Sequence, residues 1–158
     1  MKKKWIVSSI IVIVLIYALY DYHRPKYVEL SFNSVIYSID SNFEKSIVVS
    51  MKGDRYNSQI GNGKFLGELS VDEDLKYNVK LTENGNRYAG SIFAKDSNEN
   101  TITIGLVDIS HDLDKIWIQL NDINERYSLS EGYGHVVGPA STAIEANEIA
   151  RMIIEGIK

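Results

Sequence analysis

Apolar and polar residues alternate with a period of two along most of the chain that follows Tyr27. Successive side chains of a strand point to opposite faces of a sheet, so this period predicts strands with one buried face. Asn84-Gly85, between two such segments, predicts a tight hairpin, because both residues tolerate positive φ. The segments expected to form strands lie near residues 28–39, 47–51, 65–71, 75–81, 87–95, 102–106, 116–120 and 127–129.

Local features interrupt the alternation. The apolar positions shift by one residue near Asn33, which predicts a β-bulge or a bend within the first strand. Gly53-Asp54 predicts a turn that ends the next strand, and residues 53–64 have the glycine and asparagine content of a surface loop. Gly67 lies inside a predicted strand, where a glycine indicates a close approach of two backbones.

The spacing of these segments predicts a mainly β fold. Strands that recur about every ten residues with polar turns between them are typical of antiparallel sandwiches and barrels. We expect an antiparallel meander barrel or sandwich of about eight strands. A meander barrel followed by a helix would be similar in element order to the lipocalin architecture, although no motif in the sequence adds to that likeness.

The end of the chain changes to a helical period. Apolar residues recur at intervals of three and four from Ala143 to Ile157, with charged residues on the other side. Thr142 and Glu145 have the spacing of a capping box, which satisfies free backbone groups at a helix start. The sequence therefore predicts a C-terminal amphipathic helix over residues 142–156, packed on the sheet.

The other end of the chain predicts a membrane anchor. Residues 5–20 carry no charge, and three lysines precede them. Sixteen helical residues span about 24 Å, and flanking Trp and Tyr rings can extend the span to residues 5–22. The alternative is a cleaved secretory signal, but Ala18-Leu19-Tyr20 places a bulky ring where cleavage needs a small side chain.

The charges along the chain predict the orientation of the anchor in the membrane and the kind of partner that the domain does not bind. The lysines favour a cytoplasmic start at residues 1–4, a single-pass anchor and an exported domain over residues 23–158; secretion after signal cleavage is the alternative. Removing residues 1–26 takes away five of 17 basic and one of 21 acidic residues, so the remainder carries a net charge of −8. Such a charge repels phosphate backbones, so no nucleic-acid partner is expected. The chain has no cysteine, which rules out disulfides.

Candidate chemistry is sparse. His111, Asp112 and Asp114 form the most polar cluster with an imidazole, and a hydrolase using His111 with either carboxylate is one hypothesis. Tyr56 and Tyr133 are the tyrosines least explained by strand alternation, and a tyrosine ring can both pack and donate a hydrogen bond. We take these five residues as candidate binding positions, and we assign no catalytic residue, metal ligand or cofactor.

The function expected from the sequence is that of a membrane-anchored extracytoplasmic domain, non-enzymatic, that binds a protein partner at the outer membrane face. This expectation rests on the anchor at residues 5–22 and on the lack of an assembled catalytic motif in the sequence. Two alternatives stand beside it: a small-ligand carrier with a lipocalin-like barrel, and the hydrolase centred on His111.

Overall fold

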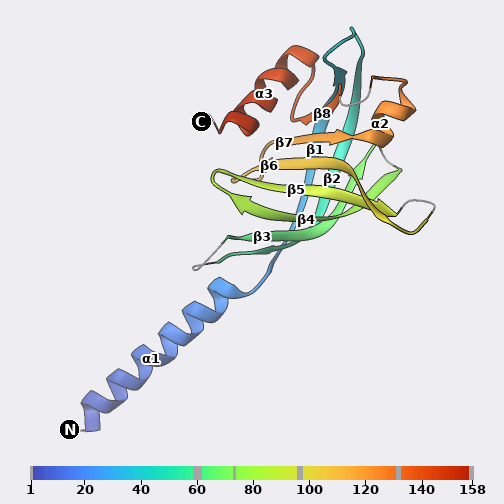
Figure 1. Cartoon of the computed structure of the whole chain (residues 1–158). Helices are drawn as coiled ribbons and strands as arrows, with labels where there is room; N and C mark the ends of the chain where they lie inside the picture. Colours follow the sequence, from blue (N-terminus) through green and yellow to red (C-terminus); the bar gives the residue numbers. More distant parts are fainter. Residues whose placement is uncertain (1, 59–61, 73, 96–97, 131–132, 157–158) are drawn as a thin grey trace.

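The strand-forming segments close into one antiparallel barrel in the computed structural model (Figure 1). The structure describes residues 2–58, 62–72, 74–95, 98–130 and 133–156, with side chains from Ile10 onward. Each strand pairs with the next along the chain, and the last pairs with the first. The strands are β1 (Lys26–Ser38), β2 (Glu44–Tyr56), β3 (Lys64–Val71), β4 (Leu75–Asn84), β5 (Arg87–Lys95), β6 (Thr101–Ser110), β7 (Ile116–Leu120) and β8 (Gly134–Gly138). The mainly β meander is thereby confirmed, as a barrel and not a sandwich.

The interior of the barrel is filled by apolar side chains. Every strand contributes to one buried cluster, with Phe65, Tyr88 and Met51 among its largest members. An eight-stranded barrel is just wide enough for side chains to fill it or for one small ligand to be held. Here the side chains occupy the centre, so any binding surface lies on the ends or the outside.

The N-terminal helix α1 (Lys2–His23) covers the segment that the sequence predicts as an anchor. Figure 1 shows α1 extending away from the barrel, and its described apolar side chains from Ile10 to Tyr22 are exposed. Counting only residues whose side chains are described, no helix is long and apolar enough to cross a membrane. The anchor at residues 5–22 stays a prediction.

The bulge predicted near Asn33 is wrong. β1 pairs with β2 in unbroken register from Lys26 to Tyr37, and the described irregularity lies between Ile92 and Phe93 instead. The apolar positions shift because Val35 and Tyr37 are buried on the outside of the barrel, beneath a helix. A strand covered on both faces loses its alternation without any change in its backbone.

The turn predicted at Gly53-Asp54 is also wrong, because β2 continues to Tyr56. Gly53 pairs with Gly67 of β3, and a Cβ atom on Gly53 would lie 2.2 Å from the carbonyl oxygen of Leu66. The close approach predicted at Gly67 is confirmed. Of the predicted loop over residues 53–64, residues 57, 58, 62 and 63 are described and are not strand, Lys64 already belongs to β3, and residues 59–61 lie outside the described residues.

The last strand lies later than predicted. The short helix α2 (Asn121–Arg126) follows β7, and the expected strand at residues 127–129 is irregular. The strand that closes the barrel is β8, whose five residues are all buried. Gly134 and Gly138 leave room there for the side chains of Asn124 and Ser34.

The C-terminal helix α3 (Ala143–Glu155) confirms the predicted amphipathic helix. Its buried face, formed by Ala146, Ile149, Ala150 and Ile153, packs on the outside of β1, β7 and β8. The Thr142 hydroxyl accepts a hydrogen bond from the Glu145 backbone N–H, and Gly156 ends the helix in a left-handed conformation.

Replacing the capping residue should loosen this helix. Thr142→Ala removes the only side-chain acceptor described for the Glu145 N–H, so we expect the free energy of unfolding to fall by about 1 kcal/mol. Hydrogen exchange of the first-turn amides measures the effect. Ser141→Ala is the matched control, because Ser141 contacts Glu145 through its backbone N–H. Equal exchange rates in both variants would contradict the capping role.

Candidate functional site

The two ends of the barrel differ in what covers them. In a meander, alternate connections lie at the same end. One end therefore carries the β2–β3, β4–β5 and β6–β7 connections together with the start of β1, where α1 joins. We call it the anchor end. The opposite end, which we call the α2 end, carries α2 and the remaining hairpin connections (Figure 1).

A charged cluster covers the α2 end. Arg126 donates to both carboxylate oxygens of Asp74 at 2.7 and 2.8 Å, and to Asp72 at 3.1 Å. Lys45 and Tyr127 also bond to Asp72. Burial acts to raise the pKa of Asp72, but hydrogen bonds from Tyr127, Arg126 and Lys45 outweigh it and hold that pKa below its usual value. These groups satisfy one another, so the cluster has a structural role.

At the anchor end, His111 lies between two carboxylates. Its Nε2 is 3.1 Å from Glu83 Oε1, and its Nδ1 is 3.5 Å from Asp112 Oδ1. The imidazole ring stacks on Tyr88 with a centroid separation of 6.1 Å. The backbone N–H of His111 donates a hydrogen bond to the Asn86 carbonyl. The β4–β5 and β6–β7 connections are therefore tied together around the imidazole.

The same network reaches the β2–β3 connection. Glu83 Oε2 accepts a hydrogen bond of 2.8 Å from the Gly63 N–H. Arg55 donates from Nε to the Tyr88 hydroxyl at 3.0 Å and lies over that ring. Tyr56 follows Arg55 at the end of β2, where it is half-buried. All three connections at the anchor end are thus linked through Glu83 and Tyr88.

A pocket of about 310 Å³ opens beside His111. Asp112 and Asp114 line it, and α3 supplies its apolar side through Met152 and Ile153. Asp114 bonds to Lys115 at 2.7 Å and to the Ser110 hydroxyl at 2.6 Å, and these two contacts lower the pKa of Asp114. Both of its carboxylate oxygens therefore have partners other than His111.

The structure brings four of the five sequence-predicted residues to one end. His111, Asp112 and Asp114 line the pocket, and Tyr56 lies at the same end. Tyr133 lies at the α2 end, where its carbonyl accepts from the Ile39 N–H, so it cannot share a small ligand with the others. Among the described residues, no group of three or more His, Asp or Glu side chains could hold a metal ion.

Three members of the network, Glu83, Tyr88 and Arg55, are missing from the prediction. Each lies within two residues of a connection at the anchor end. Counting alternate connections of the predicted meander would have placed Glu83 near His111, because the hairpin at Asn84 and the loop at Ser110 share an end.

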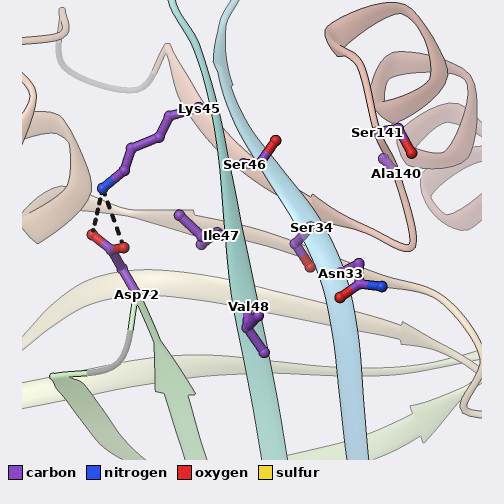
Figure 2. Close-up of a pocket in the computed structure, with 9 residues that line it drawn as sticks. All are labelled: Asn33, Ser34, Lys45, Ser46, Ile47, Val48, Asp72, Ala140 and Ser141. Carbon is purple, nitrogen blue, oxygen red and sulfur yellow. Dashed lines mark hydrogen bonds and ion pairs between the residues drawn. The ribbon is translucent and has the colours of Figure 1, made fainter.

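A larger pocket, of about 620 Å³, lies between β1, β2 and residues 140–141. Its two charged residues, Lys45 and Asp72, form an ion pair with a separation of 3.3 Å, drawn as dashed lines in Figure 2. The Ser34 hydroxyl donates to the carbonyl of Phe32. The pocket beside His111 is the better candidate site because three of the five sequence-predicted residues line it, whereas none of them lines this larger pocket.

The comparisons with known proteins found no relative of this chain. No protein-family model matches the chain, and neither the curated proteins nor the solved structures contain a match.

Proposed function

We propose that the chain is a membrane-anchored, non-enzymatic binding or accessory protein, with its barrel on the extracytoplasmic side and its binding site beside His111. The pocket of about 310 Å³ between this histidine and α3 is the observation that carries the proposal. The filled interior supports a site on the surface over a carrier with a ligand inside the barrel. At the α2 end the charged residues bond to one another, which supports the anchor end as the end that is available to a partner.

The pairing of His111 favours binding over catalysis. Glu83 faces Nε2 at 3.1 Å and Asp112 faces Nδ1 at 3.5 Å, and both nitrogens can donate to these carboxylates only when the imidazole is protonated. A general base must have a nitrogen free to accept the proton of a substrate. A hydrolase using His111 with Asp112 or Asp114 remains the alternative; of the two carboxylates, Asp112 is the one that faces the ring, because Asp114 bonds to Ser110 and Lys115.

Site-specific photo-crosslinking in intact membranes tests the proposed site. The Asp112 side chain is 90% exposed, so a photoreactive residue at that position should capture a protein partner without disturbing the barrel. We expect His111→Ala to reduce this capture about tenfold, which corresponds to the loss of one central contact of the interface.

Two controls accompany this experiment. A photoreactive residue at Ser41, exposed at the α2 end, should capture little. Tyr133→Ala, also at that end, should leave capture from position 112 unchanged. Equal capture from positions 112 and 41, or capture that His111→Ala does not alter, would contradict the site.

A further inference from the structure

We propose that the edge of the barrel next to α1 binds anionic lipid headgroups and so holds the β1–β3 side of the anchor end against the membrane, with the pocket beside His111 on the opposite side of the barrel. This inference rests on the proposed anchoring by α1. We call this surface the cationic edge; its basic residues come from the α1–β1 junction, the end of β2 and the start of β3, namely Arg24, Lys26, Arg55 and Lys64.

The short connection between α1 and β1 keeps this edge near the membrane surface. α1 ends at His23 and β1 begins at Lys26, so only Arg24 and Pro25 lie between them. Three Cα–Cα steps span at most about 11 Å when fully extended. If α1 crosses the bilayer, Lys26 cannot lie further than this from the end of the helix. The first pairs of β1 are therefore held at the level of the headgroups.

Strand register gathers the basic residues at this level. Lys26 pairs with Arg55, and Lys64 pairs with Tyr56. Lys26 and Lys64 are both exposed. The neighbouring acidic residues are Asp21, 3.6 Å from Arg24, Asp54, which pairs with Tyr27, and Glu83, which accepts a hydrogen bond from the Gly63 N–H beside Lys64. Four cations against three carboxylates leave this edge positive, although residues 27–158 together carry a net charge of −8.

The exposed apolar side chains at the same edge are accommodated better among lipid headgroups than in water. The Tyr27 side chain in β1 is 65% exposed and that of Leu66 in β3 is 39% exposed, and both residues pair with Asp54 of the intervening strand β2. Tyrosine favours the membrane–water interface, where its ring is partly buried and its hydroxyl stays hydrated. An anionic surface would attract this edge and repel the rest of the domain, which selects one orientation.

Fluorescence quenching on the full chain tests the proposal. The chain has no cysteine, so a single Asn57→Cys variant carries one fluorophore beside the edge, and Lys95→Cys carries it at the α2 end. The probes are vesicles of phosphatidylcholine, with or without phosphatidylglycerol, containing a lipid that bears a quencher on its headgroup. We expect quenching at position 57 to increase with phosphatidylglycerol and to decrease with added salt, and quenching at position 95 to stay low.

A charge-removing variant tests the role of the lysines. Lys26→Gln combined with Lys64→Gln should lower the ratio of docked to undocked barrel about 25-fold, because each cation near an anionic surface contributes about fivefold. Quenching at position 57 that is independent of phosphatidylglycerol, salt and this double variant would overturn headgroup binding. Flotation separates the two proposals. A chain that floats with both kinds of vesicle but stays unquenched refutes headgroup binding alone, whereas a chain that floats with neither refutes the anchor as well.

Discussion

Gly53→Asn should lower the free energy of unfolding by about 3 kcal/mol or more, because the new side chain has no space. A Cβ atom at this position would lie 2.2 Å from the carbonyl oxygen of Leu66 and 2.5 Å from the Cα of Gly67. Both are backbone atoms of the paired strand, so neither can rotate away. Urea unfolding in detergent micelles, followed by far-ultraviolet circular dichroism, measures the loss.

The same substitution at a true turn is the matched control. Gly85 has φ of +62° and open space around its Cα, and Asn tolerates this left-handed conformation. Gly85→Asn should therefore change the free energy of unfolding by no more than about 0.5 kcal/mol. If Gly53 were a turn glycine, both variants would behave alike. That result would refute the close packing of β2 on β3.

Acidification below about pH 6.5 should destabilise the barrel through His135. This histidine lies on the outer face of β8, with its ring 5.7 Å from Tyr37 and 5.5 Å from Trp117. Among the described residues, neither ring nitrogen has a hydrogen-bond partner. Burial lowers the pKa of His135, because a charged imidazolium at this position would lose its hydration.

The sign of the pH effect follows from proton binding. The folded state releases the His135 proton at a lower pH than the unfolded state, whose histidine pKa is about 6.5. Between these two pKa values the unfolded chain binds more protons, so the free energy of unfolding falls as the pH falls. Above that window the imidazole is neutral in both states and its contribution is constant.

Two variants separate the effect of protonating His135 from the effect of burying its unpaired nitrogens. His135→Phe should abolish this acid-dependent loss and raise the free energy of unfolding at neutral pH by about 1 to 3 kcal/mol, because no unpaired nitrogen stays buried. His135→Gln should also abolish the loss but without the gain, since an amide still needs partners. Urea unfolding between pH 5 and 8 measures both effects. Stability that increases on acidification would mean that the Tyr37 and Trp117 rings stabilise the imidazolium more than dehydration costs.

The parts of the fold that the sequence predicts correctly are those with a single buried face. β4 and β5 each expose one face to water, so their alternation is visible, and Asn84-Gly85 marks the turn between them. The capping pair Thr142 and Glu145 defines the start of α3, because backbone satisfaction there depends on residues close in sequence.

The errors arise where long-range packing covers the outer face of a strand. Val35, Tyr37 and Trp117 are apolar on that face because α3 lies on them, and no local pattern contains that contact. All five residues of β8 are buried, so this strand shows no alternation of apolar and polar residues. Tyr127 and Leu129 have the spacing of a strand, but they pack against the core from an irregular segment. The candidate site is likewise predicted only in part, because some of its residues are distant in the sequence. The neighbours His111 and Asp112 could be found in the sequence, but Glu83, 28 positions earlier, is brought to His111 by the pairing of β4 with β5 and of β5 with β6.

β1 has a mechanical consequence for a tethered domain. This one strand continues directly from α1, pairs with β2 at twelve positions and with β8 at four, and so forms the seam that closes the barrel. A pull on the tether would load those hydrogen bonds in shear along the strand, where many must break together. Lateral drag in the bilayer would then strain the seam as a unit instead of peeling it open pair by pair.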